Sequence, residues 1–155
     1  MIIAIDTNVI LDILLPDPVH SKASKPLLDK AFNLGSLILC EPVYGELSTQ
    51  FGSHDTLSDF LAQTRIRLEP SDKETLWLAS RAWGQYTKQR GRHLQCPQCR
   101  AKAEIKCCCG TQLSIRQHII SDFIIGAHAQ TQADTLLTRD RGFYKRYFPS
   151  LSLNL

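Results

Sequence analysis

The chain has 155 residues, of which 43 % are hydrophobic, and a formal net charge of +3. This length suffices for one hydrophobic core but is short for two ordinary domains, so we expect a single domain over residues 1–155. The charge neither requires nor excludes a nucleic-acid partner. The first residues lack a basic leader and reach Asp6 after a short apolar run. Because this fits neither a secretion signal nor a membrane span, we expect a cytoplasmic protein with no membrane contact.

Short, mostly apolar runs predict buried strands of a parallel sheet. They occupy residues 2–5, 36–40, 65–68 and 135–138, with a fifth run at 151–155. Helical periodicity alternates with them, at residues 9–15, 22–34, 42–50, 56–62 and 118–131. The clearest helix start is Ser71-Asp72-Lys73-Glu74, a capping box, and its helix is expected to continue to Gly91. The alternation predicts a layered α/β fold.

Four carboxylates follow or flank these elements. Asp6 comes directly after the first strand, and Asp140 lies just beyond the fourth. Because the carboxyl ends of parallel strands meet at one edge of a sheet, both are expected there, where α/β folds bind ligands. Glu46 and Asp122 can join them from helices, and Asp122 stands out because its neighbours are almost all apolar.

Such a group of acids favours a metal ion. Each close pair would repel by about 4 kcal/mol at an effective dielectric constant of about 20 and a separation of about 4 Å. Oxygen ligands select Mg²⁺ or Mn²⁺, which can activate water and stabilise a phosphodiester displacement, the chemistry of a nuclease. Each acid taken alone has a simpler interpretation: Asp6 and Asp122 as helix caps, Glu46 and Asp140 as solvated side chains.

The motifs around these acids resemble, in order, those of PIN-domain ribonucleases, and within them the VapC-type toxins of toxin–antitoxin pairs. The motifs are Ile5-Asp6-Thr7-Asn8-Val9-Ile10-Leu11-Asp12, then Glu46, then Ser121-Asp122-Phe123-Ile124-Ile125-Gly126-Ala127-His128-Ala129, then Leu137-Thr138-Arg139-Asp140-Arg141-Gly142-Phe143. The resemblance extends from Met1 to about Pro149, apart from the cysteine-rich segment.

The resemblance implies a three-layer α/β/α fold with a central parallel sheet, cleavage of RNA, frequent homodimerisation and a small antitoxin partner. It implies that the Mg²⁺ or Mn²⁺ ligands are Asp6, Glu46, Asp122 and Asp140, supported by Thr7 or Asn8 and by Thr138. Glu41 rivals Glu46 because it lies nearer the strand end, but the family places the acid inside the helix before a leucine. Asp12 is one and a half helical turns from Asp6 and is expected to be solvated.

Basic residues around Asp140 are candidates for contact with the RNA. Arg139 and Arg141 would attract phosphates without selecting a sequence. Unpaired bases would have three candidate stacking partners nearby, namely Phe143, Tyr144 and Tyr147. The alternative is that the arginines are solvated and that Phe143 belongs to the core. His128, on the apolar helix, is expected to be structural.

Five of the six cysteines lie between Cys96 and Cys109, where the helical pattern fails. In a chain with no sign of export, such clustering indicates a metal site. Cys96-Pro97-Gln98-Cys99 and Cys107-Cys108-Cys109-Gly110 provide two pairs, and four thiolates in tetrahedral array favour Zn²⁺. We therefore expect a zinc-ribbon-like insertion over residues 92–117, with the ligands Cys96, Cys99, Cys107 and Cys109.

Several alternatives remain open from sequence. Cys108 can replace Cys107, His93 or His118 can replace one thiol, and a redox dithiol or a regulatory disulfide can replace the zinc site. For the whole chain, the alternatives to a toxin are a non-catalytic nucleic-acid-binding or protein-binding module, or a PIN-type nuclease that processes RNA.

Overall fold

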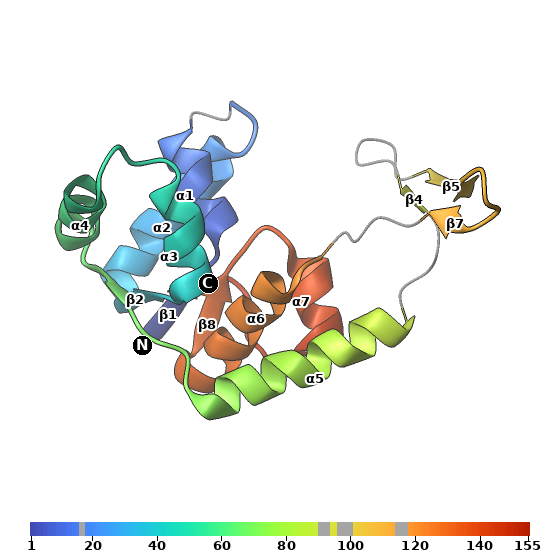
Figure 1. Cartoon of the computed structure of the whole chain (residues 1–155). Coiled ribbons are helices and arrows are strands. Elements are labelled where there is room, and N and C mark those ends of the chain that lie inside the picture. The colour runs from blue at the N-terminus through green and yellow to red at the C-terminus, as the bar shows by residue number, and fades with distance from the viewer. Residues whose placement is uncertain (16–17, 90–93, 96–100, 114–117) are drawn as a thin grey trace.

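A computed structural model describes residues 1–15, 18–89, 94–95, 101–113 and 118–155 (Figure 1). Its centre is a four-stranded parallel sheet with the strand order β3-β2-β1-β8. The strands are β1 (Ile2–Ile5), β2 (Ser36–Leu39), β3 (Ile66–Leu68) and β8 (Thr135–Leu137). The four strands predicted from apolar runs are therefore confirmed, each to within one residue of its expected bounds.

The predicted fifth strand at residues 151–155 is wrong as a strand. The tail instead forms a single parallel bridge between Leu136 and Leu153. Leu136 N–H donates to the Ser152 carbonyl and Asn154 N–H donates to the Leu136 carbonyl, so the tail lies along the outer edge of β8.

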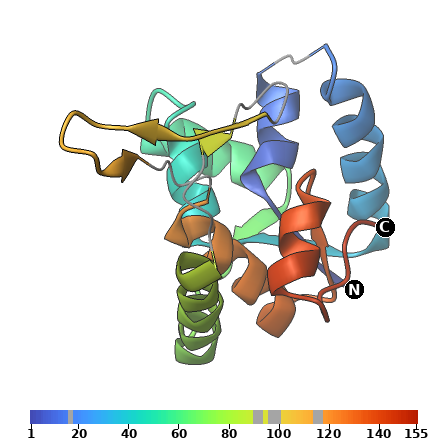
Figure 2. The same ribbon diagram turned by 90° about the vertical axis from the view of Figure 1, so that its right-hand side faces the viewer.

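Helices cover the sheet in the predicted three-layer α/β/α arrangement. Those described are α1 (Thr7–Leu14), α2 (Ser21–Leu34), α3 (Glu41–Ser48), α4 (His54–Gln63), α5 (Lys73–Gln89), α6 (Ile120–Gln132) and α7 (Arg141–Tyr147). Helix α6 packs against β1 and β8, and the long helix α5 packs along α6, as the turned view in Figure 2 also shows. Helix α7 was not among the predicted elements.

Two glycines allow close packing in this arrangement. A Cβ atom at Gly35 would overlap the carbonyl oxygen of Met1, where α2 turns into β2 beside the start of β1. A Cβ atom at Gly126 would overlap the ring of Phe148, so this glycine lets α6 lie directly on that buried ring. Both positions exclude a larger side chain for steric reasons.

The predicted capping box at the start of α5 is wrong. Thr75 N–H donates to Asp72 Oδ1 at 2.7 Å, so Asp72 caps the helix. Ser71 is engaged elsewhere, because its backbone N–H and its hydroxyl donate to the two carboxylate oxygens of Glu41, at 2.9 and 2.7 Å. This pair of hydrogen bonds joins the start of α3 to the segment before α5.

Two short antiparallel hairpins lie between α5 and α6, apart from the α/β body in Figure 1. One pairs β4 (Leu94–Gln95) with β5 (Lys102–Ala103), and the other pairs β6 (Ile105–Lys106) with β7 (Gln112–Leu113). In the part of the chain that the structure describes, no helix is both long enough and apolar enough to cross a lipid bilayer.

Candidate active site

A cleft of about 280 Å³ opens at the carboxyl edge of the sheet, where β1 and β8 end. All four acids selected from sequence border it, although they come from four different parts of the chain. The lining residues are Asp6, Glu46, Asp122 and Asp140, with Thr7, Asn8, Leu11, Arg139, Phe143 and Tyr144. The supporting residues Thr7 and Asn8 are thus in the same cleft, and Thr138 lies directly behind it.

Asp6 is the buried centre of the cleft, with only 6 % of its surface exposed. One of its oxygens, Oδ2, accepts hydrogen bonds from Thr138 Oγ1 and Asn8 Nδ2, each at 2.6 Å, and from Tyr144 Oη at 3.3 Å. Its backbone N–H donates to the Leu137 carbonyl, which ties the end of β1 to β8. The three side-chain donors all reach Oδ2 and so fix the orientation of the carboxylate.

Burial has a large electrostatic effect on Asp6. The pKa of Asp6 is raised from 3.8 to about 6, chiefly by desolvation and also by the nearby charge of Asp122, against the lowering effect of the hydrogen bonds from Thr138, Tyr144 and Asn8. A carboxylate with a raised pKa is one whose charge is poorly compensated by the protein. A cation in the cleft would supply that compensation.

Glu46 reaches the cleft from α3. The hydroxyl of Thr7, in the first turn of α1, donates a hydrogen bond to Glu46 Oε2 and so holds the side chain toward Asp6. The rival Glu41 is bound to Ser71 and does not border the cleft. The structure therefore brings Glu46 and not Glu41 to the other acids.

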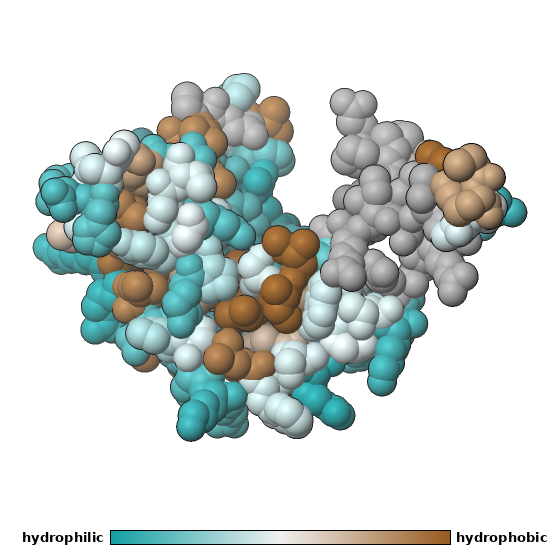
Figure 3. Space-filling view, viewed as in Figure 1, coloured by the Kyte–Doolittle hydropathy of each residue, from teal (hydrophilic) through white to brown (hydrophobic). Residues whose placement is uncertain are grey.

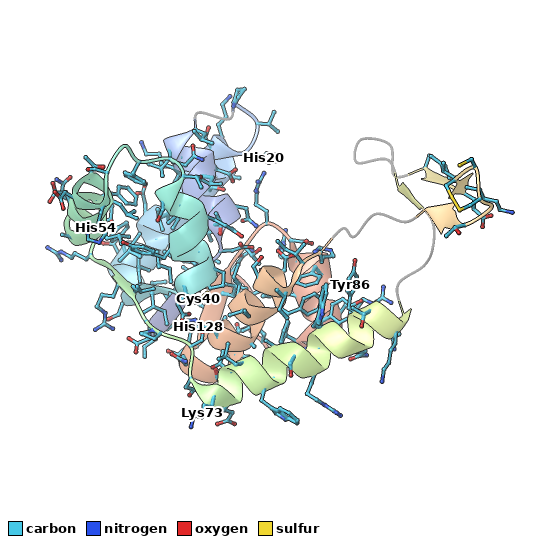
Figure 4. The ribbon with its side chains drawn as sticks, in the orientation of Figure 1. His20, Cys40, His54, Lys73, Tyr86 and His128 are labelled. Atoms are coloured by element: carbon cyan, nitrogen blue, oxygen red, sulfur yellow. A yellow bond between two sulfur atoms is a disulfide. The ribbon has the colours of Figure 1, made fainter. Side chains whose placement is uncertain are left out.

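Asp122 is the third residue of α6, and its carboxylate reaches back to the start of that helix. Ile119 N–H donates to Asp122 Oδ2 at 2.9 Å, and His118 Nδ1 lies 3.4 Å from the same oxygen. His118 stacks on Phe143, with ring centroids 4.0 Å apart, and also contacts the ring of Tyr86, which Figure 4 shows on α5. The contact with Asp122 was not anticipated from sequence, where His118 was an alternative zinc ligand.

Asp140 follows β8 and begins α7. Its Oδ1 accepts from Phe143 N–H at 3.3 Å, and its own N–H donates to Thr138 Oγ1 at 3.0 Å. Asn8 links Arg139 to Asp6: its Oδ1 accepts a hydrogen bond from Arg139 N–H at 3.1 Å, and its amide nitrogen donates one to Asp6. Helix capping and a role at the cleft are thus compatible for Asp140, as they are for Asp122.

The donor set fits a hard divalent cation such as Mg²⁺ or Mn²⁺, because every acidic side chain in the cleft offers oxygen. Among the described residues, the hydrogen bonds use a single oxygen of each acid, namely Asp6 Oδ2, Glu46 Oε2, Asp122 Oδ2 and Asp140 Oδ1. Within the same residues, no three acidic, histidine or cysteine side chains are close enough to hold one ion as they stand. Mutual repulsion keeps carboxylates apart when no cation joins them.

The prediction that Asp12 is solvated is wrong. Its side chain is buried, with 3 % exposed, where α1 packs against α2. Ser24 Oγ donates to Asp12 Oδ2 at 2.6 Å, and Arg139 Nε lies 3.1 Å from the same oxygen. Arg139, a candidate RNA contact, therefore borders the cleft while paired with a buried acid; Arg141 is exposed at the start of α7.

The aromatic residues proposed to stack on bases are mostly part of the core. Phe143 and Tyr144 are 6 % and 2 % exposed, so neither ring is free to receive a base. Tyr144 instead contributes its hydroxyl to Asp6, and burial raises its pKa well above the ordinary value. Tyr147 is partly buried against Tyr86 and Phe123.

His128 is structural, as expected. It is buried on α6, where Figure 4 marks it, and its Nε2 lies 2.9 Å from the Glu69 carbonyl. Desolvation lowers its pKa, which favours the neutral ring. Cys40 is buried at the end of β2, also as expected, and burial raises the pKa of its thiol to about 12.

The zinc prediction falls partly outside the described residues, because Cys96 and Cys99 lie there, as does His93. Cys107 and Cys109 are described, and the structure joins their sulfur atoms as a disulfide, with Cys108 exposed and free. They stand in a tight turn in which Gly110, with φ of 84°, donates its N–H to the Cys107 carbonyl at 2.9 Å. This turn lies at the tip of the β6–β7 hairpin.

A larger groove of about 600 Å³ runs along α5 and Tyr147. Among the described residues that line it, the charged ones are Arg81 and Lys88, and none is a carboxylate. We assign the candidate active site to the smaller cleft, since the acids needed to hold a cation are there and not in this groove.

The sequence analysis missed two contacts at the cleft: the one between Tyr144 and Asp6, and the one between Asp12 and Arg139. Tyr144 lies four residues after Asp140, so its position one helical turn beyond a capping acid was the available hint. No comparable hint pointed to Asp12 and Arg139, which lie far apart in sequence and meet only through the packing of α1 beside β8.

Comparison with known proteins agrees with this architecture. The family profile described as the PIN domain matches residues 3–149. A comparison with curated proteins finds no match. Among solved structures, VapBC2 from Rickettsia felis, bound to a DNA fragment from its promoter, matches with a TM-score of 0.61 and 15 % identity over 99 % of this chain and 97 % of that one.

Two further solved structures are similar. VapBC-1 from nontypeable Haemophilus influenzae matches with a TM-score of 0.61 and 14 % identity, over 99 % of this chain and 96 % of that one. FitAcB from Neisseria gonorrhoeae matches with a TM-score of 0.60 and 17 % identity, over 97 % of this chain and 95 % of that one. At these identities the matches establish the fold.

Proposed function

This chain belongs to the PIN domain family, and on that premise we propose that it is a divalent-metal-dependent endoribonuclease, the toxin of a toxin–antitoxin pair. The observation that carries the proposal is the convergence of four acids, from the end of β1, from α3, from α6 and from the start of α7, on one cleft at the carboxyl edge of a parallel sheet. A buried, partly uncompensated carboxylate at its centre supports a cation as the missing partner.

In the proposed site Asp6, Glu46, Asp122 and Asp140 hold Mg²⁺ or Mn²⁺. When bound, the cation supplies a water of lowered pKa and stabilises charge on the phosphate. The chain's own residues orient the ligands: Thr138, Asn8 and Tyr144 fix Asp6, and Thr7 fixes Glu46. Such preorganisation lowers the cost of assembling like charges around the reacting phosphate.

A small antitoxin partner is part of the proposal. The similar solved structures are named VapBC and FitAcB, and the resemblance of the sequence is to the VapC-type toxin. Apolar side chains gather over α6 on the face shown in Figure 3. At the start of this helix, close in sequence to Asp122, Ile119 and Ile120 are 55 % and 43 % exposed. Exposed apolar patches of this kind mark protein contact surfaces. Homodimerisation stays a prediction.

The insertion over residues 92–117 is proposed to bind structural Zn²⁺. The two cysteine pairs in the sequence of the insertion, Cys96 with Cys99 and Cys107 with Cys109, support this assignment, and zinc binding requires the Cys107–Cys109 disulfide to be reduced. Since so short a segment has almost no hydrophobic core, a metal would supply the free energy that orders it.

The proposal is tested with purified protein and RNA. Total RNA and transfer RNA are incubated with Mg²⁺ or Mn²⁺, with EDTA, and with a folded Asp6→Asn variant; Asp29→Asn, an exposed acid on α2, is the matched control. Cleavage by wild type and Asp29→Asn alone supports the nuclease. No cleavage by folded protein free of bound inhibitor contradicts it and favours a non-catalytic binding module.

The toxin role needs a separate test. Induced expression of the wild-type chain in bacteria is expected to arrest growth, and Asp6→Asn is not. Growth arrest that is relieved by the product of a small upstream reading frame supports a toxin–antitoxin pair. A nuclease that cleaves RNA in vitro yet leaves growth unaffected favours a role in RNA processing.

A further inference from the structure

Arg139 occupies an unusual position for an arginine, at the rim of a cleft lined by four acids. Its side chain is 40 % exposed, so part of the guanidinium meets solvent. The acids alone would repel an RNA backbone, because both carry negative charge. A positively charged side chain at this rim would oppose that repulsion.

The side chain of Arg139 forms an ion pair with a buried acid, Asp12. Arg139 Nε lies 3.1 Å from Asp12 Oδ2, and Ser24 Oγ donates to the same oxygen at 2.6 Å. Asp12 is 3 % exposed, so the pair has little competition from water on the carboxylate side. A buried carboxylate is costly unless it is paired and hydrogen-bonded, and both conditions are met here.

The backbone of Arg139 is held as well. Its N–H donates to Asn8 Oδ1 at 3.1 Å, and Asn8 also donates to Asp6. The preceding Thr138 is bound to Asp6 and the following Asp140 caps α7. The position of the arginine is therefore set by the same contacts that orient the acids.

Within the described part of the chain, Arg139 pairs with Asp12 through Nε, so its two terminal nitrogens are available for another ligand. A guanidinium has a planar set of donors that matches two oxygens of one phosphate. The ion pair with Asp12 also removes rotamer freedom that a free arginine would lose on binding. The arrangement therefore resembles a preorganised phosphate contact more than a solvated surface charge.

We propose that Arg139 binds a backbone phosphate of the substrate RNA at the rim of the cleft, and that Asp12 is the residue that positions it. The inference rests on the proposed nuclease function and adds to it a named phosphate contact and its anchor. Asp12, though acidic and close in sequence to Asp6, then belongs to substrate binding and not to the cation site.

The test separates binding from turnover. In wild type, Arg139→Gln, Asp12→Asn and the double variant, kcat and KM are measured on a short single-stranded RNA over a range of salt concentrations. Arg139→Gln is expected to raise KM about tenfold with little change in kcat. It should also lower the slope of log KM against log salt by about 0.7, the value for one phosphate contact on a single strand.

The Asp12 variant shows whether positioning matters. Asp12→Asn keeps the size of the side chain and can still accept the hydrogen bond from Ser24, but it loses the negative charge that pairs with Arg139. Its KM should therefore rise, as in Arg139→Gln. The double variant should bind no worse than Arg139→Gln alone, because both changes remove one interaction. The double variant also removes the orphaned buried charge, so it remains informative if Arg139→Gln folds poorly.

Two controls complete the design. Arg67→Gln removes an exposed arginine on β3, at the opposite edge of the sheet from β8, and should keep the wild-type KM. Arg139→Lys keeps the charge without the Nε donor and should restore part of the affinity. Wild-type KM and salt slope in folded Arg139→Gln, with active wild type, would show that Arg139 only neutralises Asp12 and overturn the inference. Wild type that neither binds nor cleaves RNA would overturn it together with the nuclease function.

Discussion

The hydroxyl of Tyr144 donates a hydrogen bond to Asp6 Oδ2 across 3.3 Å, which joins α7 to the end of β1. Tyr144 is therefore one of three donors that orient the central acid of the cleft. Tyr144→Phe removes this donor and keeps the buried ring. We expect kcat to fall about threefold to tenfold, the effect of one net hydrogen bond, with KM nearly unchanged.

Steady-state cleavage of an RNA substrate measures this effect. Tyr147→Phe, on the same helix, is the control and should keep wild-type kcat, because its ring contacts are preserved. Equal activity of Tyr144→Phe and wild type would show that Thr138 and Asn8 suffice to orient Asp6.

The raised pKa of Asp6 predicts how the metal-free protein responds to pH. Between about pH 4 and pH 6 folded Asp6 keeps a proton that the unfolded chain has released, so stability falls as pH rises through this window. Above about pH 6 the penalty is complete, on the order of 3 kcal/mol. In EDTA at about pH 7.5, Asp6→Asn should therefore have a larger free energy of unfolding than wild type, and the difference should vanish near pH 4.

Urea unfolding followed by circular dichroism measures this difference. Asp29→Asn should match wild type at every pH. A wild type as stable as Asp6→Asn above pH 6 would mean that Asp6 is well compensated without a cation.

Added cation should reverse the penalty. Because a carboxylate ligates a metal ion in its deprotonated form, the proposed role of Asp6 predicts that millimolar Mg²⁺ or Mn²⁺ raises the Tm of wild type above about pH 6 and has little effect on Asp6→Asn. At cation concentrations well below saturation, cleavage should decline as pH falls below about 6 for the same reason. Equal Tm shifts in both proteins would indicate binding of the cation elsewhere.

The cysteine pairs predict a zinc content of about one ion per chain. Cys96→Ser, Cys99→Ser and Cys109→Ser should each lose the metal, and Cys40→Ala should retain it, as measured by atomic absorption on gel-filtered protein. Cys107→Ser and Cys108→Ser identify which of these two neighbours is a ligand. A metal-free protein that has two fewer free thiols than cysteines under denaturing, non-reducing conditions, a deficit that Cys107→Ser abolishes, would instead support the Cys107–Cys109 disulfide.

The cap of α5 predicts a purely structural effect. Asp72→Ala should lower the Tm relative to wild type, because Thr75 N–H loses its acceptor. Asp72→Asn keeps an acceptor and should stay close to wild type. Equal stability of all three proteins in thermal unfolding would show that this cap does not limit the stability of the fold.

The sequence by itself determined the strands and the position of two acids. A strand buried on both faces needs a continuous apolar run, so β1 and β8 were visible locally, and parallel order then required Asp6 and Asp140 to share an edge. Glu46 and Asp122 entered through the resemblance of their motifs, because periodicity alone does not tell which acid on a helix faces a cleft. The capping box failed because Glu41 engages Ser71 from a distant segment.

Tertiary structure decided which atoms meet at the site. Tyr144 and Asp6 are 138 residues apart, and Thr138 and Asp6 are 132 apart, so no local spacing encodes either hydrogen bond. Asp12 is an acidic helix residue, a type that is usually solvated, and it is buried only because α2 and Arg139 pack over it. A local sequence pattern indicates whether a segment favours a helix or a strand. These contacts depend instead on how the helices and strands pack against one another, and that packing depends on the whole hydrophobic core.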